Sequence, residues 1–89
     1  MQSGSLAITL EYCAPCGYSQ RAAALTQEIM SVREIEYHVR SWTLIPSSGG
    51  CFELTINGET VFSKKALGRH AEPNECLNLI QARLPTLMP

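Results

Sequence analysis

The feature that most constrains the fold of this chain is a strand pattern that leads directly into a helix pattern, with two cysteines between them. Apolar and more polar residues alternate over residues 6–12, which is the period of a strand with one buried face. Apolar residues at steps of four and three over residues 18–32 predict a helix. Cys13 and Cys16, in the motif Cys-Ala-Pro-Cys, fall at the turn. Because a helix start presents unpaired N–H groups and the positive end of the peptide dipole, this position favours thiolates.

The segment after the helix predicts a second strand and then a loop. Apolar and charged residues alternate over residues 34–40, and this strand should lie parallel to the first, with a right-handed crossover, because a helix joins the two. Residues 41–50 contain Pro46 and end in two glycines, so we interpret them as a loop. In a compact fold of this order, the end of that loop is expected near the cysteine turn.

A hairpin signal follows. Residues 52–56 alternate, and Asn57-Gly58 separate them from a second apolar run, Val61-Phe62-Ser63. Since Asn and Gly both tolerate the positive φ of a type I′ turn, the two runs are predicted as antiparallel strands. In this register Phe62 falls on the opposite sheet face from Phe52.

The last predicted element is a helix. Pro73 suits its first position, and Pro85 stops it. Its apolar stripe consists of Leu77, Ile80 and Leu84. The predicted order of elements is therefore βαβββα.

The composition fits one folded domain spanning residues 1–89. Hydrophobic residues make up 45% of the chain and charged residues 17%, which indicates a globular protein with a small core. A net charge of -1, with scattered Lys and Arg, argues against nucleic-acid binding. No window approaches the roughly 20 apolar residues of a membrane helix, and no signal-peptide pattern opens the chain, so we expect a cytoplasmic protein without a membrane partner. The sequence leaves the oligomeric state open.

We interpret Cys13 and Cys16 as a dithiol-disulfide centre. A structural disulfide framework is the weaker interpretation, because Cys51 and Cys76 stand alone and a bridge across so short a loop removes little unfolded-chain entropy. A zinc site would need a second pair of ligands, and the remaining cysteines and histidines have no ligand-like spacing. We therefore expect no metal.

The other chemistry-bearing residues are assigned to packing or to the surface. Cys51 is either a third redox thiol or, as we expect, a small buried hydrophobe, and Cys76 is expected in the core. His38 and His70 are expected at the surface. The aromatic residues expected to pack are Tyr37, Trp42 and Phe62.

The chain resembles the selenoprotein W, T and H group, the Rdx family of thioredoxin-like proteins, in the segments EYCAPCGYSQRA, SSGGCFELTINGETVFSKK and EPNECLNLIQARL. The similarity covers residues 6–84, and its most specific parts are the thiol motif after the first strand and the Gly-Gly-x-Phe-Glu start of the hairpin. This resemblance, to a bacterial-type Cys-x-x-Cys member, implies an α/β, thioredoxin-like fold with a mixed four-stranded sheet and two helices. The sequence departs from common family residues at Ser47-Ser48 and at His70-Ala71.

The family resemblance implies a small thiol-disulfide oxidoreductase of cell redox homeostasis that cycles Cys13 and Cys16. From the placement of the cysteine motif we expect glutathione or a protein disulfide as the exchange partner, with glutathione as a co-substrate and no resident cofactor. Animal members often carry selenocysteine at the position of Cys16, whereas a thioredoxin analogy makes Cys13 the attacking sulfur, so both are kept as catalytic and Cys16 is preferred. The alternative is a redox-regulated protein-binding adaptor with little catalytic turnover. A partner-binding loop is expected at Ser48, Gly49, Gly50 and Cys51.

Overall fold

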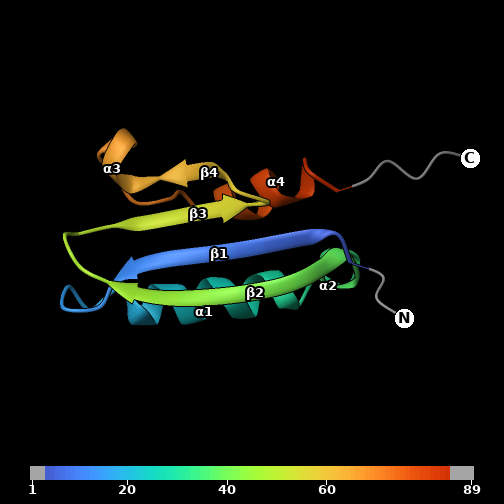
Figure 1. Cartoon of the computed structure of the whole chain (residues 1–89), viewed down its shortest axis with the longest axis horizontal. Coiled ribbons are helices and arrows are strands. Elements are labelled where there is room, and N and C mark those ends of the chain that lie inside the picture. Colours follow the sequence, from blue (N-terminus) through green and yellow to red (C-terminus); the bar gives the residue numbers. More distant parts are fainter. Residues whose placement is uncertain (1–3, 85–89) are drawn as a thin grey trace, which may run out of the picture.

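The computed structural model describes residues 4–84 and shows a four-stranded sheet with helices packed on it (Figure 1). In chain order the elements are β1 Leu6–Cys13, α1 Ser19–Met30, α2 Arg33–His38, β2 Val39–Ser47, β3 Phe52–Ile56, β4 Glu59–Ser63, α3 Lys64–Leu67 and α4 Glu75–Gln81. The strand order is β2-β1-β3-β4. β1 lies parallel to β2 and antiparallel to β3, which is antiparallel to β4. The predicted mixed α/β sheet is confirmed, and the short helices α2 and α3 add to the two that were predicted.

The hydrophobic core lies between one face of the sheet and the two longer helices, α1 and α4 (Figure 1). Alternate residues of β1 and β3 point into it, as their sequence patterns predict. The apolar stripe predicted on α1 contributes three buried side chains to this core, those of Ala22, Leu25 and Ile29. Edge strand β2 is tied to α1 because the Trp42 Nε1–H donates a 2.8 Å hydrogen bond to the Thr26 hydroxyl.

Residues 33–47 fold differently from the sequence prediction. The strand predicted at 34–40 is mostly helix α2, and most of the loop predicted at 41–50 is strand β2. Ile35 and His38 are buried together because a spacing of three places them on one helix face. β2 lies at the edge of the sheet and is largely exposed, so it lacks apolar alternation, and an edge position tolerates Pro46.

The predicted exposure of two side chains in this region, His38 and Tyr37, is also wrong. His38 is buried, and its Nδ1 lies 3.0 Å from the carbonyl oxygen of Glu34. Because a carbonyl oxygen only accepts, that nitrogen carries the proton. Tyr37, which was expected to pack, is 62% exposed, with its ring against the His38 imidazole at a centroid distance of 5.1 Å.

The β3–β4 hairpin has the predicted turn but a different register. Asn57-Gly58 adopt φ of 51° and 85°. The pairing shifts between Leu54 and Thr55, so that Phe62 lies opposite Leu54 and is only 2% exposed. The prediction that Phe62 faces away from Phe52 is wrong, because one extra residue in a strand of period two exchanges its faces.

Helix α4 is shorter than predicted. It begins after Asn74, whose backbone is left-handed at φ 67°, so Pro73 precedes the helix instead of opening it. Its buried side chains are Cys76 and Ile80, which confirms the core position of that cysteine. The predicted stop, Pro85, lies outside the described residues.

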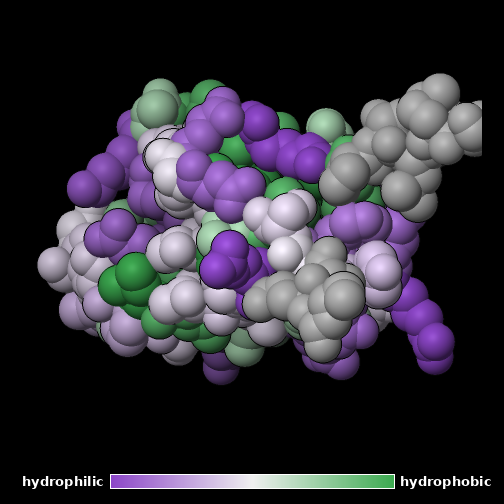
Figure 2. All heavy atoms as spheres, turned by 45° about the vertical axis from the view of Figure 1, so that its right-hand side comes forward, coloured by the Kyte–Doolittle hydropathy of each residue, from purple (hydrophilic) through white to green (hydrophobic). Residues whose placement is uncertain are grey.

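On the face shown in Figure 2, the hydrophobic atoms form separate areas with hydrophilic atoms between them. The large apolar side chains exposed in the described part are Tyr37, Leu44, Ile45 and Leu67. None of the helices in these residues has the length and apolar character needed to cross a membrane.

Candidate functional site

Cys13 and Cys16 are joined by a disulfide bond, with 5.3 Å between their Cα atoms. Cys13 is the last residue of β1 and is 1% exposed. Cys16 lies in the turn before α1 and is exposed. The structure therefore brings the two predicted site residues together, with one partner buried in the protein and the other facing solvent.

The backbone of the turn places Cys16 two residues before Tyr18, the N-cap of α1. The Gly17 N–H donates to the Ala14 carbonyl oxygen at 3.0 Å, and the Tyr18 N–H donates to that of Cys13 at 3.2 Å. Gly17 adopts φ 81°, a left-handed angle that other residues reach at a cost of roughly 1–2 kcal/mol. The first turn of α1 contains no acidic residue. No carboxylate in this turn therefore offsets the positive end of the helix dipole, which favours a thiolate at Cys16.

The loop between β2 and β3 lies beside the turn that follows β1, at the left end of the sheet in Figure 1. The Cys13 N–H donates to the Cys51 carbonyl oxygen at 2.9 Å. The Ala14 N–H donates to the Ser47 carbonyl oxygen, also at 2.9 Å. The cysteine turn and this loop are therefore held together by backbone hydrogen bonds at both ends of the loop.

The four residues predicted for this loop differ in exposure. Ser48 and Gly49 are exposed, Gly50 is half-buried, and Cys51 is a free thiol at 2% exposure. The expected burial of Cys51 is confirmed. Both glycines adopt positive φ, 80° and 75°, which explains the Gly-Gly pair before β3.

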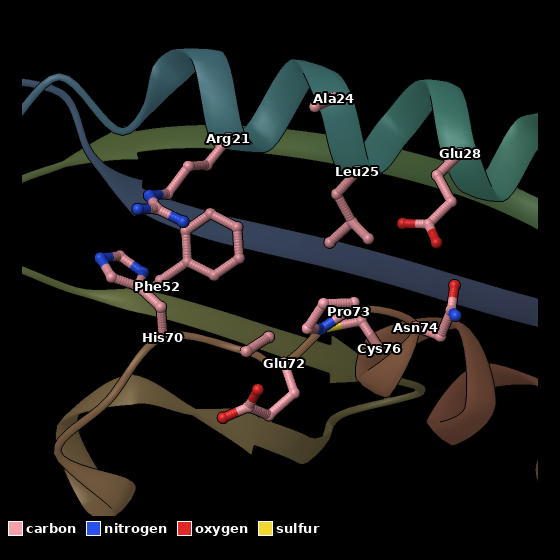
Figure 3. Close-up of a pocket in the computed structure, with 11 residues that line it drawn as sticks. Arg21, Ala24, Leu25, Glu28, Phe52, His70, Glu72, Pro73, Asn74 and Cys76 are labelled. Atoms are coloured by element: carbon pink, nitrogen blue, oxygen red, sulfur yellow. The ribbon is translucent and has the colours of Figure 1, made fainter.

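A pocket of about 530 Å³ lies between α1 and the segment that leads into α4 (Figure 3). Arg21 and His70 lie together at one end of it, near Phe52. Glu28 and Asn74 lie toward the other end. The pocket thus has a basic side chain at one end and an acidic one at the other.

His70 connects this pocket to the cysteine turn. Its ring meets Tyr18 edge-on at a centroid distance of 4.7 Å and Phe52 at 6.1 Å, and the residue is half-buried. Tyr18 belongs to the turn that follows the disulfide. The pKa of His70 is lowered, first by burial and then by the positive charges of Arg21 and Lys64. The sequence prediction placed His70 at the surface and missed this contact.

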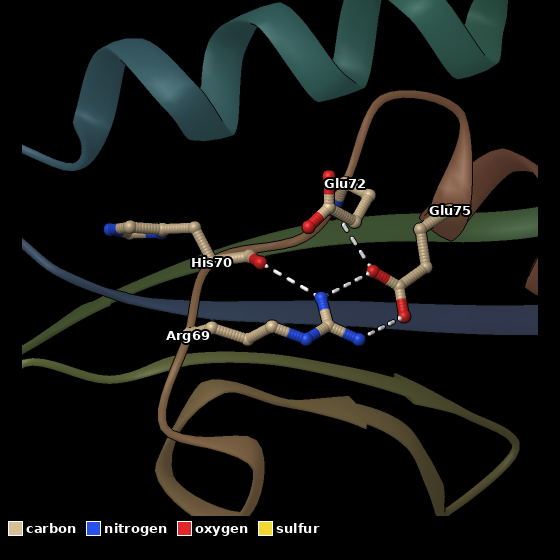
Figure 4. A network of polar contacts seen from close by, with 4 residues as sticks. All are labelled: Arg69, His70, Glu72 and Glu75. Atoms are coloured by element: carbon tan, nitrogen blue, oxygen red, sulfur yellow. Dashed lines mark hydrogen bonds and ion pairs between the residues drawn. The ribbon is translucent and has the colours of Figure 1, made fainter.

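An ion pair fixes the segment that carries His70 (Figure 4). The Arg69 guanidinium donates to both carboxylate oxygens of Glu75, at 2.8 and 3.0 Å, and to the His70 carbonyl oxygen at 3.0 Å. The same carboxylate accepts the Glu72 N–H at 2.9 Å. The hydrogen bond from Arg69, followed by that from the Glu72 backbone, lowers the pKa of Glu75 to about 2. No sequence pattern predicted the Arg69–Glu75 ion pair, since Arg69 lies in the loop before α4 and Glu75 is the first residue of that helix.

Cys76 contributes a thiol to the pocket wall but is a poor nucleophile. Burial, with smaller contributions from the charges of Glu75 and Glu28, raises the pKa of Cys76 to about 12. It therefore stays protonated at neutral pH. Within residues 4–84, no three or more His, Cys, Asp or Glu side chains gather closely enough to hold a metal ion.

Most of the chain matches one protein family. Residues 7–82 match the model of the Rdx family. Migration and invasion enhancer 1 of Mus musculus is 39% identical over 61 residues, an alignment that covers 64% of this chain and 46% of that protein. The chain thus spans about half the length of this curated relative.

Two solved structures share the fold. A selenoprotein W-related protein from Vibrio cholerae superimposes with a TM-score of 0.81 at 24% identity, covering 92% of this chain and 100% of that one. A protein from Bordetella parapertussis gives 0.80 at 25% identity, covering 89% and 98%. The predicted thioredoxin-like fold and the resemblance to selenoprotein W-related proteins are confirmed.

Proposed function

Because this chain belongs to the Rdx family, we propose that it is a small thiol-disulfide oxidoreductase that cycles Cys13 and Cys16 between dithiol and disulfide. The observation that carries the proposal is the bond between an exposed and a buried cysteine at a strand-to-helix turn. The accessible sulfur reaches a partner, and the buried one completes the reaction from within the protein.

The reaction starts from the reduced pair. The Cys16 thiolate attacks one sulfur of a partner disulfide, and the first partner thiolate leaves. The Cys13 thiolate then attacks the Cys16 sulfur, closes the Cys13–Cys16 bond and releases the second partner thiolate. The partner gains two electrons and two protons, which the cysteine pair loses. A Cα separation of 5.3 Å supports a rapid second step because both sulfurs lie on one short turn.

The assignment of Cys16 as the attacking sulfur rests on exposure and position. Cys13 is 1% exposed, so a partner disulfide has no direct approach to its sulfur. Cys16 is exposed and precedes the first turn of α1, where the dipole stabilises a thiolate.

The proposed partner is glutathione or a protein disulfide. The pocket beside the turn supports a peptide-like partner, because Arg21 suits a carboxylate and Glu28 suits an ammonium group. Two glutathione molecules would reduce the Cys13–Cys16 bond again and leave as glutathione disulfide. Cys51 and Cys76 are free thiols, which suits the reducing environment of the cytoplasm.

A redox titration tests this function. The protein is equilibrated in buffers of varied glutathione to glutathione disulfide ratio, quenched with acid and alkylated, and the free thiols are mapped by mass spectrometry. A Cys76→Ala variant is the control, because its only missing thiol lies outside the pair. Reversible loss of alkylation at both Cys13 and Cys16 is the expected result. Full alkylation of either cysteine at every glutathione ratio would refute the proposed function.

A protein-binding adaptor is the second candidate. The observation that favours it is the exposed edge strand β2, which carries the exposed Leu44 and Ile45 and ends beside the disulfide at Ser47. An adaptor would keep its partner after both Cys13 and Cys16 are replaced by serine, whereas an oxidoreductase would lose the covalent complex.

A further inference from the structure

We infer that Cys51 is a third member of the redox site, which takes over the bond to Cys13 and releases Cys16 as a free thiol. This inference rests on the proposed function, because it needs the Cys13–Cys16 disulfide as its starting point. It adds a second oxidised form of the protein, with a Cys13–Cys51 bond.

The sheet register places Cys51 across from Cys13. β1 and β3 are antiparallel, with Tyr12 opposite Phe52, and one further step along the ladder sets Cys13 opposite Cys51. The hydrogen bond from the Cys13 N–H to the Cys51 carbonyl oxygen, at 2.9 Å, shows that the pairing continues to this step.

This pairing brings the two cysteines close to bonding distance. Residues directly opposite in an antiparallel ladder project to the same face, with Cα atoms about 5.5 Å apart when they are hydrogen-bonded, which falls within the roughly 4.4–6.8 Å that disulfides span. Their Cβ atoms are also about 5.5 Å apart, against roughly 3.5–4.5 Å in a disulfide, so closing the bond requires this end of the ladder to move by roughly 1 Å. Cys13 and Cys51 are both buried, at 1% and 2% exposure, so neither sulfur is directed into solvent away from the other.

The exchange needs no external oxidant. The Cys51 thiol loses its proton, and the resulting thiolate attacks the Cys13 sulfur. The Cys13–Cys16 bond breaks, the Cys13–Cys51 bond forms, and Cys16 leaves as a thiolate that takes up one proton. The protein remains at the same oxidation level. Cys16 is the favoured leaving group because it is exposed at the start of a helix, where its negative charge is stabilised.

The second oxidised form has a different chemistry. Once Cys13 is bonded to Cys51, it is no longer free to resolve a mixed disulfide at Cys16. A partner captured at Cys16 then stays attached until the Cys13–Cys51 bond is reduced. Bonding of Cys51 to Cys13 would thus change the site from one that releases its partner after each reaction to one that keeps the partner covalently attached.

Trypsin separates the two oxidised forms. Cleavage after Arg21, Arg40 and Lys64 leaves Cys13 and Cys16 in the peptide 1–21, and Cys51 in the peptide 41–64. The Cys13–Cys16 bond is therefore internal to one peptide, whereas the Cys13–Cys51 bond links two. Acid quenching before digestion prevents exchange during the work-up.

The experiment compares oxidised wild type with a Cys16→Ser variant. Hydrogen peroxide is the oxidant, because it is small enough to reach buried sulfurs, and it forms water as it oxidises a thiol pair. Wild type is expected to give both the internal bond and the linked peptides. Cys16→Ser is expected to give the linked peptides and alkylation at Cys76 alone. The Cys16→Ser/Cys51→Ala variant is the matched control, and it should lose the link.

The outcomes separate this inference from the proposed function. Absence of the internal Cys13–Cys16 bond in wild type would refute the proposed function. An internal bond in wild type without linked peptides, there or in Cys16→Ser, would overturn only the role of Cys51. Circular dichroism of each variant confirms folding, which is expected because Cys16 is exposed and Cys51→Ala only shortens a side chain.

Discussion

Truncation of Phe62 tests the register on which the core of the β3–β4 hairpin depends. Phe62 is 2% exposed, and Phe62→Ala should destabilise the protein by about 3–5 kcal/mol through lost burial and the cavity left behind. Val61 is half-buried, so Val61→Ala should cost about 1 kcal/mol. Phe62→Ala is expected to cost more than Val61→Ala because the strand pairing shifts between Leu54 and Thr55. A regular two-residue hairpin would place Val61 in the core instead.

The assay is urea unfolding followed by the fluorescence of Trp42, the only tryptophan in the chain. A domain of 89 residues has a total stability of about 4–13 kcal/mol, so Phe62→Ala removes a large part of it, and all of it at the lower end of that range. Phe62→Leu, which should cost less than about 1.5 kcal/mol, keeps the comparison measurable if the alanine variant does not fold. A larger loss of stability in Val61→Ala than in Phe62→Ala would refute the register and the core described above.

Three further outcomes follow from the described contacts. Glu75 has a pKa of about 2 instead of the ordinary 4.5, so its pairing with Arg69 stabilises the fold above pH 4.5 and is lost as pH falls toward 2; the difference in urea midpoint between wild type and Glu75→Gln should shrink over that interval. Asn57→Ala should cost about 1–2 kcal/mol in urea unfolding, since Asn57 has φ 51° and accepts the Ala7 N–H at 2.8 Å, and Asn57→Gly should recover the backbone part. Cys76, with a pKa of about 12, should resist iodoacetamide at pH 8 in the folded protein and react in urea; labelling at equal rates in both would contradict its burial.

Local patterns predicted the parts of the fold that hold the disulfide. The alternation of β1 and the stripe of α1 each depend on residues close in sequence, and both are buried against the same core. The Asn57-Gly58 turn was also predictable, because it depends on the φ angles of two neighbouring residues. The placement of Cys13 and Cys16 between a strand and a helix follows from these elements alone.

The features that were wrongly predicted from the sequence depend on contacts between residues distant in sequence. β2 has no apolar alternation because it lies at the sheet edge, and only its pairing with β1 reveals it as a strand. The extra residue in β4 has no local sequence signal, so Phe62 was assigned to the wrong face. His70 reaches Tyr18 across the fold, a contact that no spacing in the sequence announces. The pocket of the candidate site was missed for the same reason.

The central claim is that exposed Cys16 attacks and buried Cys13 resolves, and trapping with glutathione disulfide tests it most directly. Cys13→Ser and Cys16→Ser are each reduced, exposed to glutathione disulfide for the same time, quenched with acid and analysed by mass spectrometry. A stable glutathione adduct is expected on Cys16 in Cys13→Ser, and none is expected on Cys13 in Cys16→Ser. An adduct on Cys13 that forms as fast as the one on Cys16 would contradict it.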